Sequence, residues 1–186
     1  GKSLKEQGFF DIYPDEKERF YVKAPVFSFN KIRGLDAYLS PEMKSTGEAI
    51  GYDRTMNRAL YKALQASGMH LQNYGTVFCT IADKDKEEAL PLIRRFYQLG
   101  FNIEATTHAL AKVSDGSDEI PNALRQGHIA YFINTKDLGS NTESDGVILR
   151  QIATEYNVTM FTSLDTVKAL LDVLEETTLT ISTIDA

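Results

Sequence analysis

The chain has 186 residues, of which 42% are hydrophobic, so it can bury the core of one domain, or of one domain and a piece of another. Its formal charge of −6 disfavours general binding to nucleic acid, because affinity for the phosphate backbone comes from a surplus of lysine and arginine. A single cysteine excludes a disulfide framework within one chain, and no apolar run approaches the ~18 residues of a membrane span, so we expect a soluble, cytoplasmic protein without nucleic-acid or membrane partners.

The first residues of the chain predict little regular structure. Residues 1–8 are typical of the end of a helix closed by Gly8, and they are expected to belong to a longer protein. The polar stretch 11–19 predicts a loop. An edge strand interrupted by Pro25 is expected over 20–29.

A second stretch, 30–51, is rich in turn-forming glycine, serine and proline and is expected to be irregular. Apolar residues then recur at helical spacing over 55–65, and this pattern ends at Ser67 and Gly68. A helix is therefore expected to lead into a second structural unit, which starts near Leu71.

Residues 75–107 predict a strand, a helix and a strand, and the rest of the chain is organised around them. A continuous apolar run over 77–81 is followed by charges and then by apolar residues at helical spacing as far as Phe96. A second apolar run covers 101–103. Because a helix between two short buried strands forms a right-handed crossover, the two strands should lie parallel and end at the same edge of a sheet.

The remaining chain continues this alternation and predicts a doubly wound, mostly parallel α/β sheet with helices on both faces. The tail 177–186 is expected to be either a short strand or disordered. The expected elements are a helix over 118–126, a strand over 128–134, a polar loop over 134–145, a helix over 146–157, a strand over 158–161 and a helix over 164–176.

In such a sheet, ligands bind at the carboxyl ends of the strands, where the polar loops 82–86, 105–112 and 134–145 are expected. Lysines, hydroxyls and helix N-termini suit a phosphate group, so a phosphorylated small molecule is one interpretation of these loops. The other is an ordinary solvated surface. The candidate residues are Thr80, Lys84, Lys86, Thr106, Thr107, Lys112, Asn134, Thr135 and Lys136.

Other candidate chemistry is weaker. The three histidines lack metal-ligand spacing, so no metal site is expected. The charged run 83–88 suits the N-terminus of a helix, although Pro91 implies that this helix begins late or bends. Cys79 lies in an apolar strand and is expected to pack in the core. No catalytic residue is predicted from these patterns.

The motifs of the chain resemble one enzyme family. The stretch 30–51, with PEMKSTGE at 41–48, resembles the segment that closes the second synthetase half of the large chain of carbamoyl phosphate synthase. The rest of the sequence, beyond residue 51, resembles the C-terminal regulatory domain of that large chain, whose fold is similar to methylglyoxal synthase. The matching motifs are GTVFCTIADKDKEE, LGFNIEAT, AKVSDGS, FINT, DGVILR and FTSLDT.

This resemblance covers nearly the whole chain and implies its division into four parts. Residues 1–50 would be an irregular α+β remnant of the synthetase domain, which has the ATP-grasp fold. Residues 51–70 would form a connecting helix, 71–176 the allosteric domain and 177–186 a tail.

The resemblance also implies a function. The parent would be a ligase that makes carbamoyl phosphate from bicarbonate, glutamine-derived ammonia and ATP, for pyrimidine and arginine biosynthesis. Its expected cofactors are ATP with Mg or Mn, and its expected partners are a glutaminase small chain and further copies of itself. Because the ATP-binding lobe lies upstream in the family, this portion is expected to hold no cofactor and to be regulatory rather than catalytic.

Family members bind the nucleotide effector UMP, or in some bacteria IMP, in the allosteric domain. The resemblance assigns the phosphate to Lys86, Thr106 and Lys112. It also implies an ornithine contact at Thr162, at the interface with the synthetase domain. The other pocket residues that it implies are Thr80, Asn134, Thr135, Lys136 and, near the ribose, Asp145.

The chain departs from the family pattern after Thr107, where a helix and a strand are missing before Lys112. Either the sheet has lost this unit or the sequence omits a segment. The second is favoured, because losing an interior unit would expose apolar faces of the core.

Two further functions stay open at this stage. A lyase like methylglyoxal synthase would need a carboxylate base beside the phosphate, for which Asp83 and Asp145 are the candidates. A structural module would mediate self-association and bind no ligand.

Overall fold

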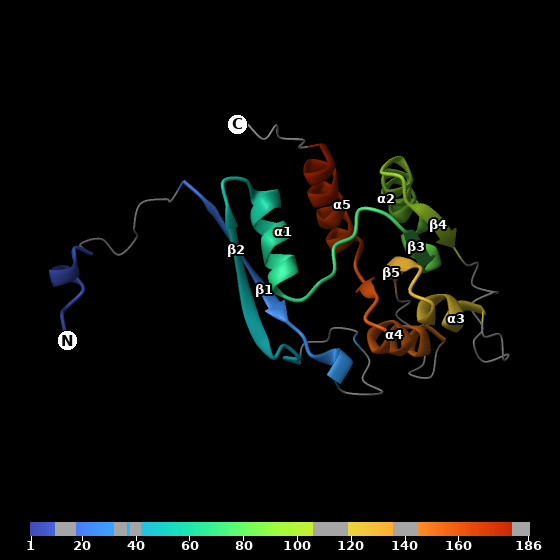
Figure 1. Cartoon of the computed structure of the whole chain (residues 1–186), viewed down its shortest axis with the longest axis horizontal. Helices are drawn as coiled ribbons and strands as arrows, with labels where there is room; N and C mark the ends of the chain where they lie inside the picture. The colour runs from blue at the N-terminus through green and yellow to red at the C-terminus, as the bar shows by residue number, and fades with distance from the viewer. Residues whose placement is uncertain (10–17, 32–36, 38–41, 106–118, 136–144, 180–186) are drawn as a thin grey trace.

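The structure is a computed structural model that describes residues 1–9, 18–31, 37, 42–105, 119–135 and 145–179. Within these residues, two β-sheets are combined with helices (Figure 1). The elements in order are η1 (Lys5–Gln7), β1 (Phe20–Val26), η2 (Phe29–Lys31), β2 (Gly47–Asp53), α1 (Met56–Ala66), β3 (Thr76–Thr80), η3 (Asp83–Asp85), α2 (Lys86–Gln98), β4 (Asn102–Ala105), α3 (Glu119–Arg125), β5 (Ile129–Asn134), α4 (Asp145–Glu155), β6 (Thr159–Phe161) and α5 (Leu164–Leu179).

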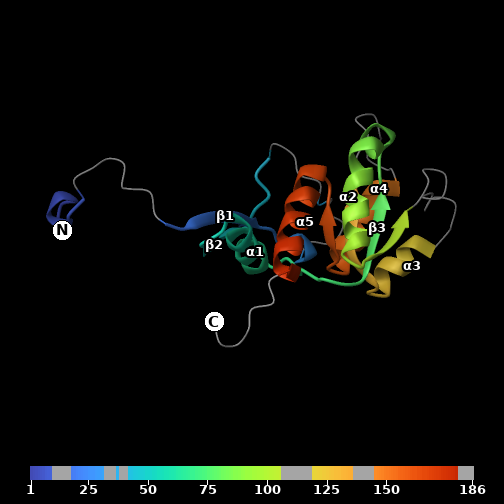
Figure 2. The ribbon, with the colours of Figure 1, turned by 90° about the horizontal axis from the view of Figure 1, so that it is seen from above.

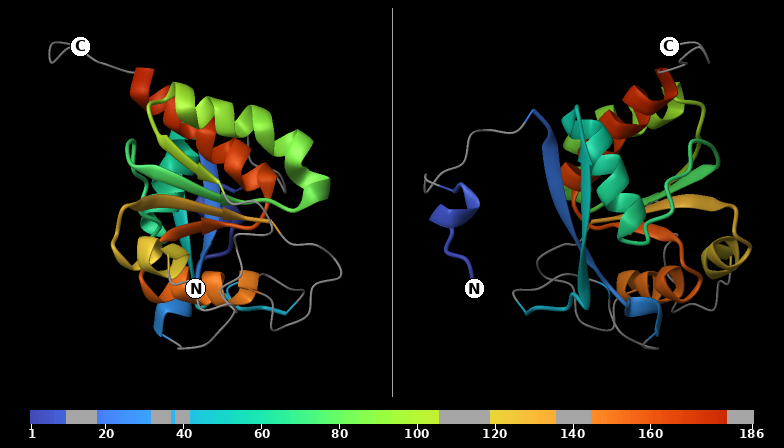
Figure 3. Two further views of the ribbon diagram at one scale, coloured as in Figure 1. Left: turned by 90° about the vertical axis from the view of Figure 1, so that its right-hand side faces the viewer. Right: turned by 60° about the vertical axis from the view of Figure 1, so that its left-hand side comes forward.

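The larger sheet is parallel and has the strand order β4-β3-β5-β6. From β3 the chain passes outward to β4, then returns to the other side of β3 and continues through β5 to β6, so the direction of winding reverses between β3 and β5. Helices α2 and α5 cover one face, and α3 and α4 cover the other (Figure 3, left). The expected α/β class, with a parallel sheet between helices, is therefore confirmed.

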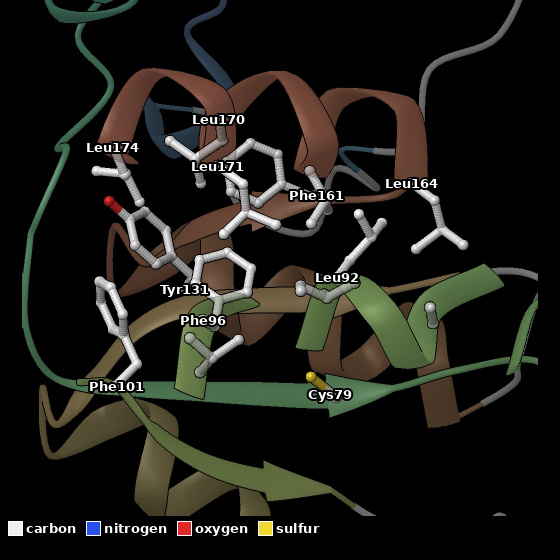
Figure 4. Close-up of a cluster of buried hydrophobic side chains, with 14 of the residues drawn as sticks. Cys79, Leu92, Phe96, Phe101, Tyr131, Phe161, Leu164, Leu170, Leu171 and Leu174 are labelled. Atoms are coloured by element: carbon white, nitrogen blue, oxygen red, sulfur yellow. The ribbon is translucent and has the colours of Figure 1, made fainter. Parts of the chain in front are cut away.

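Alternation along the strands divides the core between these two faces. Val77 and Cys79 pack under α2 and α5, whereas Phe78 packs toward α3 and α4. Tyr131 occupies the middle of the first face, where its ring lies 5.9 Å from that of Phe96 and 6.0 Å from that of Phe161 (Figure 4). The expectation that Cys79 packs in the core is confirmed.

The smaller sheet pairs β1 with β2 in antiparallel register, from Phe20 opposite Asp53 to Val26 opposite Gly47. Its inner face packs on α1, and the closest approach is at Gly51. A Cβ atom at this position would lie 2.2 Å from the Ala59 carbonyl oxygen. The sheet and helix can therefore approach this closely only because position 51 has no side chain.

The prediction that 30–51 is irregular was wrong for its last residues, which belong to β2. The buried position of this strand is Gly51, so the apolar alternation that identifies a strand is missing. Strand β2 also continues past residue 50, where the boundary between a synthetase remnant and a connecting helix was expected.

Two N-terminal predictions need correction. Pro25 does not interrupt β1, because it lies within the strand opposite Glu48, and each strand of a two-stranded sheet has an open edge that tolerates a residue without an N–H. The strand ends at Val26 and η2 follows, so it does not reach residue 29. The expected helix end before Gly8 is a single 3₁₀ turn, closed by Gly8 at a left-handed φ of 88°.

Helix α5 connects the two sheets. It lies between α1 and α2 in two perpendicular views (Figures 1 and 2). The Thr55 hydroxyl caps α1 by accepting a bond from the Arg58 N–H, and it donates to a Glu176 carboxylate oxygen of α5 at 2.8 Å. Among the described helices, none combines the length and the apolar character needed to cross a membrane.

Candidate functional site

Strands β3 and β5 end side by side at the point where the winding of the sheet reverses. Their last residues, Thr80 and Asn134, are partners in the parallel register. The Thr80 carbonyl also accepts a bond from the Thr135 N–H at 3.1 Å, which extends the pairing by one residue. Because ligands of open α/β sheets bind at such a reversal, the ends of β3 and β5 are the candidate site, and we call this edge of the sheet the crevice.

A chain of side-chain hydrogen bonds links the ends of β3 and β5 to helix α4. The Asn134 amide nitrogen Nδ2 donates to the Thr80 hydroxyl at 2.5 Å. The Arg150 guanidinium, from α4, donates to Asn134 Oδ1 at 2.7 Å. Arg150 is only 2% exposed and Asn134 only 4%, so these two members of the set are enclosed within the protein, whereas Thr80 is half-buried.

A second hydroxyl is held nearby. The Thr135 Oγ1 atom accepts a bond from the backbone N–H of Ala82 at 2.8 Å. This bond ties the loop that leaves β3 to the loop that leaves β5. The structure therefore brings together Thr80, Asn134 and Thr135, three of the residues predicted to line the site.

Lys86 is the first residue of α2, which the chain enters from β3 through the 3₁₀ turn η3. Its ammonium group forms an ion pair with the Asp83 carboxylate, three residues earlier. The two side chains are 57% and 75% exposed, so the pair contributes little to stability. Lys86 is thus a solvent-accessible cation on the segment that leaves the crevice.

The side chains of five other predicted residues cannot be placed. Thr106, Lys112 and Lys136 lie outside the described residues, as do Thr107 and the break in the family pattern that comes after it. Asp145 is the first residue of α4, but its side chain is also outside the described set.

Arg150 is a site residue that the sequence predictions missed. Gly146, Leu149, Arg150 and Ala153 have the spacing i, i+3, i+4, i+7, which places the arginine on the apolar face of α4. A charged residue at a core position was the signal that could have identified it. A Cβ atom at Gly146 would lie 3.4 Å from Arg150 Nη1, so the start of α4 fits closely over this side chain.

No protein-family model matches the chain, so the chemistry of the crevice is inferred from the groups that it contains. The described crevice offers hydroxyl groups above a buried guanidinium, which suits an anion. In the part of the chain that the structure describes, no three His, Cys, Asp or Glu residues lie close enough together to hold a metal ion. Cys79 precedes Thr80, but burial raises the pKa of its thiol to about 12, so it is not a ready ligand or nucleophile.

Thr162 lies elsewhere, in a cleft of about 590 Å³ between the β1–η2 segment and the connection from α4 through β6 to α5. The described lining includes Lys31, His70 and several hydroxyls, but no carboxylate. Ornithine carries two ammonium groups, and burying a cation requires a partner of opposite charge. The described residues of this cleft therefore offer ornithine the Thr162 hydroxyl, but no carboxylate to pair with its ammonium groups.

Proposed function

We propose that the chain is the regulatory portion of a carbamoyl phosphate synthase large chain, with a methylglyoxal synthase-like allosteric domain. In this proposal the crevice at the ends of β3 and β5 binds the phosphate of a nucleotide effector, UMP or IMP. The observation that carries it is the hydrogen-bonded set of Thr80, Asn134 and Arg150 at the reversal of the sheet. The motif resemblance over nearly the whole chain supports the same assignment.

The groups at this site match the needs of a phosphate. A phosphate monoester presents only acceptor oxygens apart from its single titrating proton, and hydroxyl donors and cations are its usual partners in proteins. Thr80 and Thr135 supply hydroxyls at the strand ends, and Lys86 supplies an exposed ammonium. Because α2 begins at Lys86, the positive end of its helix dipole also favours an anion in this position.

The proposal leaves catalysis to the rest of the parent enzyme. In this proposal the ligase reaction, with ATP and Mg or Mn and a glutaminase small chain as partner, is carried out by other parts of the parent enzyme. Thr162 is a weaker part of the proposal, because the described lining of its cleft lacks an acid for ornithine.

A lyase activity is not favoured by the geometry. Asp83, one of its two candidate bases, is 75% exposed and paired with Lys86, whereas this proton transfer works best in a site that excludes water. An assay for release of methylglyoxal from a triose phosphate tests this alternative directly, and measurable turnover would support it.

Thermal melting with UMP tests the proposed function. Ligand at about 100 times its dissociation constant should add ~2.7 kcal/mol to the free energy of unfolding. The Lys86→Ala variant should fold normally, because the side chain is exposed, but lose most of this increase. Lys168→Ala, an exposed lysine of α5, is the matched control and should respond as the wild type does.

The absence of any shift in the wild-type protein at millimolar UMP and IMP would argue against the proposed function. Gel filtration with and without nucleotide then tests the structural alternative. Self-association that ignores nucleotide, together with an unchanged melting temperature, would favour a module that binds no ligand.

A further inference from the structure

Arg150 is an unusual residue for the apolar face of a helix. It is 2% exposed and shares that face with Leu149 and Ala153, which are also buried. Removing a guanidinium from water is costly, and buried ion pairs can often be replaced by apolar residues without loss of stability. Packing alone therefore does not explain an arginine here, and its contact with Asn134 places it directly beneath the candidate site.

The arginine determines which group donates and which accepts in each hydrogen bond of this set. A guanidinium group can only donate, so the atom of Asn134 that it meets at 2.7 Å must be the carbonyl oxygen Oδ1. The NH₂ group of the same amide must then face Thr80, whose hydroxyl oxygen accepts at 2.5 Å. The hydroxyl proton of Thr80 is consequently directed away from Asn134 and remains available as a donor.

The Thr135 hydroxyl is also oriented as a donor, in this case by a backbone N–H group. Its hydroxyl oxygen accepts from the Ala82 N–H, so its proton is also available to a ligand. Each of these two hydroxyls at the strand ends thus accepts a hydrogen bond from the protein through its oxygen, and its proton can be donated to a ligand. This arrangement offers donors to the crevice and suits ligands whose oxygens accept.

We propose that Arg150 is a positioning residue for anion recognition, which orients the Asn134 amide so that the Thr80 hydroxyl is presented as a donor. The crevice then selects phosphate oxygens over cations and other donor groups. The inference rests on the proposed function, because it concerns the same site, but it assigns a role to a residue that does not touch the ligand.

The test compares three variants of the full chain. Arg150→Met removes the charge and the donor, whereas Arg150→Lys keeps both. Arg125→Met makes the same change in an exposed arginine at the end of α3, before β5 begins and thus at the opposite edge of the sheet. Calorimetric titrations use UMP, inorganic phosphate and uridine as probes.

We expect Arg150→Met to weaken UMP and phosphate binding about tenfold or more, as for the loss of a charge-assisted hydrogen bond, and to leave uridine binding unchanged. Arg150→Lys should restore affinity to within about threefold, and Arg125→Met should match the wild type. In ¹⁵N spectra of the free protein, the side-chain NH₂ signals of Asn134 should move toward free-amide values in Arg150→Met but not in Arg150→Lys, which a purely structural role would not cause.

The possible negative results distinguish failure of the proposed function from failure of the positioning role. A wild-type protein that binds neither UMP nor phosphate would overturn the proposed function and this inference with it. Normal UMP binding by Arg150→Met, or an equal loss of uridine binding, would overturn the positioning role alone. If Arg150→Met does not fold, Thr80→Val and Thr80→Ser keep the inference testable: Val should lose about tenfold in phosphate affinity and Ser should not, and equal affinities would overturn it.

Discussion

Cys79 and Tyr131 place two ionisable groups on the same face of the parallel sheet. Burial raises the pKa of the Cys79 thiol to about 12. Burial is also the main reason that the pKa of Tyr131 is raised to about 12, although its hydroxyl both donates to the Gln72 carbonyl at 2.6 Å and accepts from the Gln72 N–H at 2.8 Å. Both groups are therefore held neutral in the folded protein.

This neutrality predicts a loss of stability in alkaline solution. The unfolded chain releases the thiol proton near pH 9 and the phenol proton near pH 10, whereas the folded chain retains both to about pH 12. The folded state then binds more protons, so the free energy of unfolding falls as pH rises, by on the order of 1 kcal/mol per pH unit for each group. Urea denaturation between pH 8 and 11 measures the slope.

Cys79→Ala provides the control for this prediction. The variant should lose the part of the slope that begins near pH 9 and keep the part that begins near pH 10, which belongs to Tyr131. Identical slopes for the variant and the wild type would show that the thiol is not protected by burial.

At the scale of elements, the contact of β2 with α1 depends on a single glycine. A side chain at Gly51 would meet the Ala59 carbonyl oxygen at 2.2 Å and the Ala63 backbone nitrogen at 2.3 Å. Both partners are backbone atoms of a helix and cannot move aside independently. The antiparallel sheet can therefore pack on α1 only in this register.

Gly51→Ala should lower the free energy of unfolding by about 2 kcal/mol or more, because the added methyl group forces the sheet and the helix apart. Gly47→Ala, in the same strand, is the matched control. Its Cβ atom would lie 3.7 Å from that of Val26, an ordinary contact, so the change should be within ~0.5 kcal/mol. Equal effects in chemical denaturation would contradict the close approach at Gly51.

The two sheets differ in how far the sequence could predict them. Apolar runs alternating with helical spacing predicted the parallel sheet, because its central strands β3 and β5 are buried on both faces and the covering helices carry apolar stripes. Strand β2 escaped prediction because its buried position is a glycine. The order of strands and loops predicted that Thr80 and Asn134 lie together, but it did not predict their connection to Arg150, since only the fold shows that this face of α4 meets Asn134.

A second contact between elements joins α2 to α5. The Arg95 guanidinium donates through Nε and Nη2 to the two carboxylate oxygens of Glu175, each at 2.8 Å, and through Nη2 to Asp172 at 2.5 Å. The bond with Glu175 is the main cause that holds the pKa of Arg95 above its usual value. The carboxylates are partly exposed, so solvent reduces the gain in stability.

Arg95→Met should therefore cost only about 1 kcal/mol of unfolding free energy, and less at high salt because these charges are screened. Arg94→Met changes the exposed neighbour on the same helix and should have almost no effect. Denaturation curves at low and high ionic strength measure both. A cost for Arg95→Met that does not change with salt would indicate lost packing rather than lost charge.

At the scale of the whole molecule, the two sheets are protected unevenly. Strands β3 and β5 lie inside the parallel sheet with helices on both faces. Among the described residues, helix α1 covers one face of the β1–β2 sheet, while Tyr21, Ile50 and Tyr52 of the other face are exposed. Because a two-stranded sheet is marginal by itself, this part of the protein should open most easily.

Hydrogen exchange should show this difference directly. We expect amides of β3 and β5 to exchange only by global unfolding, and those of β1 and β2 to exchange through local opening that costs at least ~2 kcal/mol less. Helix α1 should open together with β2, because Gly51 places the strand against its backbone. Helix α5 should stay protected, since Leu170, Leu171 and Leu174 are buried against the parallel sheet. Mass spectrometry of exchanged peptides from the full chain measures each segment, and protection of β2 equal to that of β5 would show that α5 couples both sheets into one cooperative unit.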